Sequence, residues 1–325
     1  MIRAADTRRI LIAGAGALGS VFGGFLRRAG HAVTLLGRAM HLEAIAARGL
    51  RIEGLWGEHC VTDLHLATGA EQLRGQFDAV LVIVKAYDTT TIARTVAPFL
   101  APDGVVISLQ NGLDNAEALA AAVGDRVLAG RVIFGAEVVE PGRVRITVYA
   151  DPVLIGVWDQ GAASALHAQA RTWAERLAAA DIPAQYCADI RSALWGKILY
   201  NTALNALSAL LRVHYGALGE HPDTRAIMDA VIEETFAVAA AERVTLPWAS
   251  AAEYRDVFYG RLLPSTFDHR ASMLHDLERG RRTEIDAMNG AVWKRGAARG
   301  IATPFNELLT RLVRARERMR NGLTR

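Results

Sequence analysis

The amino-acid sequence predicts an α/β protein in which a doubly wound parallel sheet is followed by an all-helical domain. Short apolar runs typical of buried strands alternate with segments of helical periodicity in the first part of the chain, whereas only helical patterns occur later. The length of 325 residues suits about two domains. We therefore expect residues 1–187 to form the sheet domain and residues 188–325 the helical domain.

The sheet domain begins with the pattern of a strand, a glycine-rich turn, a helix and a second strand. An apolar run at residues 10–13 predicts the first strand, and residues 32–36 predict the second. Between them, apolar residues recur at i, i+3, i+4, i+7 and i+8, which places them on one face of a helix. The whole has the length of a βαβ unit of about 30 residues.

Two further buried strands are predicted at residues 79–84 and 105–109, with a helix at residues 91–99 between them. Alternating strands and helices favour a mostly parallel sheet.

At the edge of this sheet we expect an antiparallel hairpin. Residues 143–149 alternate polar and apolar side chains, and Asp151 and Pro152 separate them from the apolar run at residues 153–157. A helix at residues 162–180 and a short strand at residues 184–186 complete the domain. Beyond them, helices are predicted at residues 192–211, 224–243 and 283–299.

The turn after the first strand has the spacing G-x-G-x-x-G. In this context the first glycine permits the tight turn, the second lets the backbone approach a pyrophosphate, and the third lets helix and strand pack closely. A merely flexible turn is the alternative, but strand and helix both stand where dinucleotide binding requires them. The first domain is therefore predicted to be of Rossmann type, with a cofactor on Gly14, Ala15, Gly16, Ala17, Leu18 and Gly19.

The end of the second strand predicts which dinucleotide binds. NAD-binding proteins place Asp or Glu there to bond the ribose hydroxyls. This chain has Gly37 and Arg38, and no acidic residue before Glu43. A guanidinium pairs well with a 2′-phosphate, so NADP(H) is predicted over NAD(H), the alternative being an ordinary surface arginine.

Composition excludes several other classes of protein. The net charge of +3, from 37 basic and 34 acidic residues, is too small for a nucleic-acid-binding surface. Cys60 and Cys187 have no disulfide or zinc spacing, and the nine histidines show no metal spacing. The uncharged stretch at residues 10–26 is broken by five glycines, which argues against a signal peptide or membrane span. We expect a cytoplasmic protein with no metal, membrane or nucleic-acid partner.

Only three of the basic residues are lysines, so arginine serves most surface positions. Composition bias explains the scarcity, but each lysine is then worth considering by itself. Lys85 follows the strand at residues 79–84, and Asn111 follows the strand at residues 105–109. Both therefore lie at carboxyl ends of parallel strands, where open α/β sheets bind ligands.

Lys197 begins a polar stripe on an otherwise apolar helix. Asn201, Asn205 and Ser208 follow at i+4, i+8 and i+11, which places all four on one face. A solvent-exposed stripe is the alternative, but in this chain such a face would carry Arg and Glu. The pattern favours the polar lining of a pocket. Glu284 could belong to it or be an ordinary acidic residue in a first helical turn.

Taken together, these motifs resemble the ketopantoate reductase family, the NADP-dependent 2-dehydropantoate 2-reductases, over essentially the whole chain. The chain departs from the family's pattern at Tyr215, where well-known members place an asparagine against the substrate, and at residues 130–142, which align with an insertion. The matching pieces are the Gly14 to Gly19 turn, Arg38, Val84-Lys85-Ala86, Asn111-Gly112, Ala193-Leu194-Trp195 with Lys197, Asn201 and Asn205, Ser272 to Asp276, and Thr283 to Gly290.

The resemblance implies a role for each matching residue. It implies that Lys197 is the general acid and that Glu284 is a catalytic carboxylate touching the substrate hydroxyl or the cofactor. It implies cofactor contacts at Lys85, Asn111 and Ala136 beside the glycine turn. Substrate contacts are implied at Asn111, Lys197, Asn201, Asn205 and Ser272.

The function implied is NADPH-dependent reduction of ketopantoate to pantoate in pantothenate biosynthesis, by a homodimer whose helical domain closes over the substrate. Hydride transfer to the 2-oxo carbon places negative charge on the oxygen, which an ammonium group can stabilise and protonate. Two alternatives stay open. One is reduction of another 2-oxo acid or carbonyl compound, and the other is a non-catalytic NADP(H)-sensing regulator.

Overall fold

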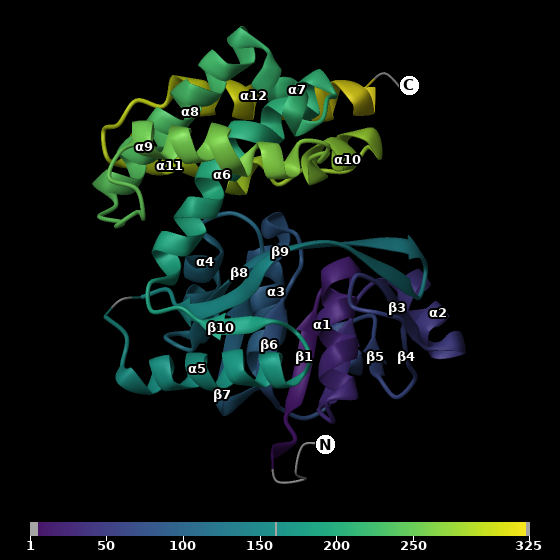
Figure 1. The fold of residues 1–325 in the computed structure, drawn as a ribbon. Coiled ribbons are helices and arrows are strands. Elements are labelled where there is room, and N and C mark those ends of the chain that lie inside the picture. Colours follow the sequence, from purple (N-terminus) through teal and green to yellow (C-terminus); the bar gives the residue numbers. More distant parts are fainter. Residues whose placement is uncertain (1–5, 160, 323–325) are drawn as a thin grey trace. The chain divides into compact units, whose positions relative to one another are not determined.

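The computed structural model describes residues 6–159 and 161–322, which form two compact units (Figure 1). The first unit contains the chain up to Gln110 and Asn115–Ile190. The second contains Asn111–Asp114 and the chain from Arg191 onward. The chain thus passes from the first unit to the second between Ile190 and Arg191. The short segment 111–114, which the sequence assigns to the sheet domain, belongs with the helices.

Within the described part of the first unit, ten strands form one sheet: β1 (Arg9–Ala13), β2 (Ala32–Leu36), β3 (Leu50–Gly54), β4 (His59–Val61), β5 (His65–Ala67), β6 (Phe77–Val82), β7 (Leu100–Ser108), β8 (Val127–Glu140), β9 (Arg143–Val157) and β10 (Ala184–Tyr186). The strand order is β4-β3-β9-β8-β7-β6-β1-β2-β5, with β10 beside β9. From β5 to β8 all neighbours are parallel. The order reverses between β1 and β6, which is the switch point where such sheets bind ligands.

Helices cover both faces of this sheet, as a doubly wound fold requires. Along β1, Ile10 and Ile12 join a core with α1 and α5, whereas Leu11 and Ala13 join a second core with α3 and α4. The predicted fold class is therefore confirmed. The helices of this unit are α1 (Ala17–Arg28), α2 (Ala39–Arg48), α3 (Thr89–Val96), α4 (Asn115–Val123) and α5 (Ser164–Ala179).

The predicted hairpin within residues 143–157 is wrong. These residues form the single strand β9, and its antiparallel partner is β8. Asp151 and Pro152 do not end the strand, because they lie where the β8–β9 register is irregular and Ile133 faces Asp151. Such an irregularity can accommodate a proline that a regular ladder would exclude.

The described part of the second unit contains helices and no strand (Figure 1). Apolar residues of α6 form its core with residues from most of the other helices. The helices are α6 (Ile190–Leu211), α7 (Tyr215–Glu220), α8 (Pro222–Ala241), α9 (Ala251–Val257), α10 (Ser272–Glu278), α11 (Asn289–Ala298) and α12 (Pro304–Gly322).

The predicted helix at residues 283–299 begins later than expected. Glu284 precedes a 3-10 turn, η7 (Ile285–Ala287), and the α-helix starts only at Asn289. The Thr283 hydroxyl accepts a hydrogen bond from the Ile285 N–H at 3.3 Å. Side chains that bond nearby backbone in this way compete with helix formation. Glu284 is therefore not part of an acidic first helical turn.

A buried polar network joins four helices of the second unit. Glu234 on α8 accepts hydrogen bonds from the Phe305 and Asn306 N–H groups at 2.8 and 2.9 Å, and so caps α12. Asn289 at the start of α11 donates to the Asn306 side chain at 3.1 Å and to the Thr202 carbonyl oxygen of α6 at 3.0 Å. The network fixes the start of α11 against α6.

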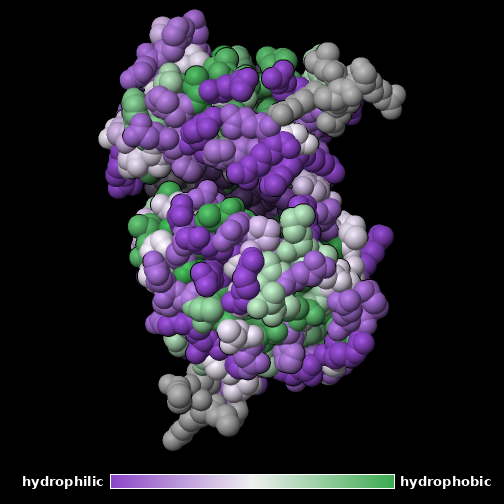
Figure 2. Space-filling model, turned by 90° about the vertical axis from the view of Figure 1, so that its right-hand side faces the viewer, coloured by the Kyte–Doolittle hydropathy of each residue, from purple (hydrophilic) through white to green (hydrophobic). Residues whose placement is uncertain are grey.

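The surface carries hydrophobic groups among a mostly hydrophilic covering on the face that Figure 2 shows. In the described part of the chain, no helix is long and apolar enough to cross a membrane. Large exposed hydrophobic side chains include four on β8 and β9 (Val138, Val139, Val148, Tyr149) and four along α12 (Phe305, Leu308, Leu312, Met319).

We expect Glu234→Ala to lower the free energy of unfolding by about 1–3 kcal/mol, because it leaves the first N–H groups of α12 without their acceptor. The neighbouring Glu233 is a matched control. It is 55% exposed and pairs with Arg255, so Glu233→Ala should cost under about 1 kcal/mol. Denaturant unfolding of both variants measures the difference, and equal losses would contradict the proposed cap.

Candidate functional site

The glycine turn after β1 is held between the ends of two neighbouring strands. Gly14 has φ +114°, and its N–H and that of Ala15 donate to the Leu36 carbonyl oxygen at 3.0 and 2.9 Å. A Cβ on Gly14 would lie 2.7 Å from the Val84 nitrogen, just beyond β6. Only glycine fits there. The turn therefore lies at the switch point of the sheet.

The other two glycines of the motif have opposite surroundings. A Cβ on Gly19 would clash with the Gly14 carbonyl oxygen, whereas one on Gly16 would meet nothing within 4 Å. Gly16 is exposed and caps the N-terminus of α1, whose first turn contains Ala17 and Leu18. The backbone is thus open where a pyrophosphate must approach, and the helix dipole faces the same point. This geometry fits a dinucleotide.

The predicted cofactor residues outside the glycine turn occupy different places. Arg38 follows β2, is exposed and precedes α2, and Lys85 follows β6 and is half-buried. Both lie beyond the carboxyl ends of strands that neighbour β1. Ala136 lies far along β8, opposite Ile146, where it packs against a hydrophobic core.

A buried polar chain supports the ends of β6 and β7, and sequence reasoning missed it. Gln110 donates hydrogen bonds to the Val84 carbonyl oxygen at 3.0 Å and to the Thr89 hydroxyl at 2.7 Å. Thr89 in turn donates to the Asn115 side chain at 2.9 Å. A glutamine directly after an apolar strand was the available signal. These hydrogen bonds fix the backbone at Val84, next to Lys85, and at Gln110, next to Asn111.

In the second unit, Lys197 and Asn111 are in contact. Lys197 on α6 is half-buried, and its Nζ donates to Asn111 Oδ1 at 2.7 Å. One helical turn further, Asn201 is 9% exposed and forms no hydrogen bond with another described side chain. A buried amide needs partners. The amide of Asn201 is therefore available to a polar ligand beside the lysine.

The remaining members of the stripe on α6 are bonded within the protein. Asn205 accepts a hydrogen bond from the Tyr215 hydroxyl and donates to Met288 Sδ at 3.3 Å. Burial raises the pKa of Tyr215 above its usual value, which keeps the hydroxyl protonated as a donor. Ser208 donates to the Val213 carbonyl oxygen. Of the stripe's three uncharged members, Asn205 and Ser208 are thus bonded within the protein, and the Asn201 amide is the one available to a ligand.

Glu284 is 6% exposed and lies on a segment that hydrogen bonds connect to this group. Five residues later, Asn289 is bonded to α6. The Ala287 carbonyl oxygen accepts from the Leu113 N–H at 2.9 Å, next to Asn111. Ser272 is the exposed first residue of α10, and no hydrogen bond of the described residues joins it to these groups.

Comparison with known proteins shows the family to which the chain belongs. The family model described as "Ketopantoate reductase PanE/ApbA" matches residues 10–160, and the one described as "Ketopantoate reductase PanE/ApbA C terminal" matches residues 189–317. The chain belongs to the ketopantoate reductase family. The 2-dehydropantoate 2-reductase of Aquifex aeolicus is 40% identical over 95% of this chain and 97% of its own. That of Archaeoglobus fulgidus is 36% identical over 95% of this chain and 98% of its own.

Solved structures agree with membership of the ketopantoate reductase family. A PanE/ApbA family ketopantoate reductase from Ralstonia eutropha has a TM-score of 0.85 and 37% identity, covering 96% of this chain and 99% of its own. D-mandelate dehydrogenase with NADH and anilino(oxo)acetate also has a TM-score of 0.85, at 27% identity, with the same coverage of 96% and 99%. The prediction of an oxidoreductase is confirmed. With the geometry of the glycine turn, these similarities assign a nicotinamide cofactor to the chain.

The two glycines with opposite surroundings give a test of the cofactor site. We expect Gly16→Ala to fold with a stability within about 0.5 kcal/mol of wild type. It should nevertheless bind NADPH at least about tenfold more weakly, because the methyl group occupies the approach to the backbone. Gly19→Ala is the control for packing and should lose about 1–3 kcal/mol of stability.

Fluorescence titration with NADPH and thermal unfolding without it separate the two effects. Wild-type affinity in Gly16→Ala would exclude this turn as the pyrophosphate site.

Proposed function

We propose that this chain reduces 2-dehydropantoate to pantoate with NADPH, the step of pantothenate biosynthesis implied by its family. Two relatives that match nearly the whole chain carry the name 2-dehydropantoate 2-reductase. The observation that carries the proposal is the 2.7 Å hydrogen bond that holds the Lys197 ammonium on Asn111, one turn from the available amide of Asn201. A cofactor sensor would need no such proton donor.

Lys197 is the general acid in this proposal. The nicotinamide, when bound, supplies the hydride for the 2-oxo carbon. Lys197 stabilises the negative charge that develops on the oxygen and then delivers a proton to it. Asn111 accepts one of the three N–H donors of the ammonium and so orients the group. The buried Glu284 carboxylate contacts the substrate hydroxyl or the cofactor.

Amides and a hydroxyl hold the rest of the substrate. Asn201 is the amide best placed to bind a polar group of the substrate, because it has no protein partner among the described side chains. For Asn205 to contribute, the substrate must replace Met288 Sδ, a weak acceptor, as the partner of Nδ2. Ser272 gives a further contact from α10. Lys85, Asn111 and Ala136 remain the proposed cofactor contacts outside the glycine turn and Arg38.

A second candidate is the reduction of another 2-oxo acid. The similarity to D-mandelate dehydrogenase, whose structure contains anilino(oxo)acetate, supports it. Both candidates need the same lysine, and they differ in the side chain that the site accepts.

We also propose a homodimer in the cytoplasm. The exposed side chains of Phe305, Leu308 and Leu312 along α12 support an interface with a second copy.

Cys60 and Cys187 are both free thiols, which is the state that a reducing compartment maintains and which supports the proposed cytoplasmic location.

We expect wild-type protein to oxidise NADPH in the presence of ketopantoate, and more slowly with pyruvate, 2-oxoisovalerate or oxaloacetate. Lys197→Ala should lower kcat at least about 100-fold, because it removes the general acid. Its affinity for NADPH should be unchanged, since the glycine turn is intact. Absorbance assays and a cofactor titration measure both quantities. If the wild type oxidised NADPH with none of the four acids, the sensor would be favoured. Full turnover by Lys197→Ala would exclude Lys197 as the general acid.

Arg38→Ala should reduce the preference for NADPH over NADH by about 10- to 100-fold, because a charge-assisted bond to the 2′-phosphate is lost. The kcat/KM for NADH should stay the same. Arg48, at the other end of α2, is the matched control and should leave the preference as it is. The ratio of kcat/KM for the two cofactors is the measurement, and an unchanged ratio in Arg38→Ala would refute the assignment.

A further inference from the structure

The segment 111–114 adopts a conformation that needs support from outside. Gly112 has φ +92° and Asp114 has φ +71°. The left-handed region costs an L-residue about 1–2 kcal/mol, although aspartate tolerates it better than most. Asp114 is therefore held in place by its surroundings, and its partners lie in the helical unit.

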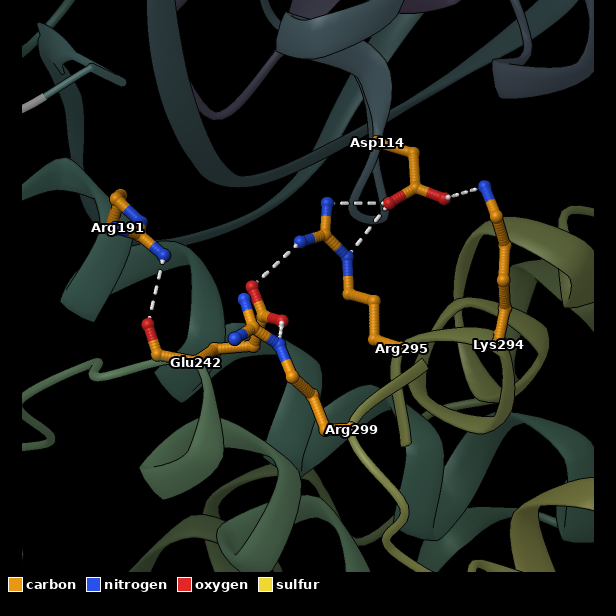
Figure 3. Close-up of polar contacts among 6 residues, drawn as sticks. All are labelled: Asp114, Arg191, Glu242, Lys294, Arg295 and Arg299. Atoms are coloured by element: carbon orange, nitrogen blue, oxygen red, sulfur yellow. Dashed lines mark hydrogen bonds and ion pairs between the residues drawn. The ribbon is translucent and has the colours of Figure 1, made fainter. Parts of the chain in front are cut away.

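Arg295 on α11 supplies the main support (Figure 3). Its Nε and Nη2 lie 2.8 and 2.5 Å from Asp114 Oδ1, and its Nη1 lies 3.1 Å from Glu242 Oε2. One guanidinium thus bridges two carboxylates. Its N–H donors lie in one plane and point to both partners at once, a fixed geometry that a lysine ammonium does not have. Lys294 and Arg299 add one ion pair each at the outer ends, on Asp114 and Glu242 respectively.

Burial separates the strong contacts of this cluster from the weak ones. The side chains of Arg295 and Glu242 are 15% and 11% exposed, whereas those of Arg299 and Lys294 are 51% and 76% exposed. Exposed ion pairs contribute little, because water and salt screen them. The bridge from Glu242 through Arg295 to Asp114 therefore carries most of the interaction.

The other contacts of the segment transmit this support to Asn111. Leu113 is buried and its N–H is bonded to the Ala287 carbonyl oxygen. A Cβ on Gly112 would lie 2.5 Å from the same oxygen, so the backbone is in close contact there. Asn111 directly precedes Gly112 in the sequence, and its side-chain oxygen accepts the hydrogen bond from Lys197. A shift of Asp114 would therefore move the amide that orients the lysine.

We propose that Arg295, fixed by Glu242, is a positioning residue that acts through Asp114 and Asn111 to orient the Lys197 ammonium for proton delivery. The inference rests on the proposed role of Lys197. According to this inference, the reduction step depends on Arg295, although Arg295 does not touch the reacting groups.

The test compares Asp114→Asn and Arg295→Met with wild type in single-turnover NADPH oxidation. Asparagine tolerates a positive φ, so Asp114→Asn keeps the backbone while removing the charge. In Arg295→Met, Glu242 keeps Arg299 and Asp114 keeps Lys294 as partners. We expect the reduction step to slow about tenfold or more in both variants, through misplacement of the acid. Its solvent isotope effect should rise, because proton delivery by the misplaced ammonium then limits the step more.

Two comparisons distinguish positioning from a loss of stability. Arg299→Ala removes an ion pair on the same Glu242 and should leave the reduction rate unchanged. Asn111→Ala should slow reduction by itself, and adding Asp114→Asn should slow it no further, because both act through one contact. Thermal unfolding shows whether each variant is folded.

Wild-type reduction rates in both Asp114→Asn and Arg295→Met, with Lys197→Ala inactive, would overturn the positioning role alone. Additive losses in the double variant would overturn it as well. Full turnover by Lys197→Ala would instead overturn the proposed acid, and the positioning role with it.

Discussion

The candidate site depends most on the hydrogen bond between Lys197 and Asn111. Its acceptor stands on a four-residue segment that leaves the sheet unit after Gln110 and packs with the helices before the chain returns at Asn115. The positive φ of Asp114 makes this path unfavourable by itself, whereas Gly112 adopts a positive φ freely. The buried Leu113 and the ion pairs of Asp114 offset that cost. The fold thus supports an energetically poor local conformation in order to bring an amide to a lysine, as is common at functional sites.

The glycine turn of the first unit and the amide cluster of the second unit rely on different physical effects. The turn is defined by space, because each of its glycines either packs where a side chain would clash or leaves backbone open. The cluster is defined by hydrogen bonds and charge, with buried amides whose partners decide whether they are available to a ligand. Asn201 and Asn205 are one turn apart on α6, yet only the second has its amide occupied by Tyr215 and Met288. In the proposed site, substrate selection would therefore depend on Tyr215 and Met288, which do not belong to the motif itself.

Sequence was sufficient for the features that depend on local pattern. The strand, turn and helix around Gly14 to Gly19 follow from periodicity and glycine spacing, and Lys197 is conspicuous as a charge on an apolar helix. The continuous strand β9 was missed because its irregular register depends on β8, a strand that local alternation did not reveal. Glu284 was placed in a helix because the bond from Thr283 that breaks the helix is not visible in composition. The partners of Asp114, Lys294 and Arg295, are 180 and 181 residues away in sequence, beyond any local pattern.

The uneven use of lysine and arginine has a physical basis in the second unit. Arg295 bridges two carboxylates with a planar group that stays charged at any physiological pH, which suits a fixed support. The proposed acid must instead release a proton, which an ammonium can do and a guanidinium effectively cannot. Under the proposed mechanism, a chain with arginine at 34 of its 37 basic positions therefore still needs a lysine at position 197. The exposed Lys294 is under no such constraint, because an arginine would serve equally well as the outer partner of Asp114.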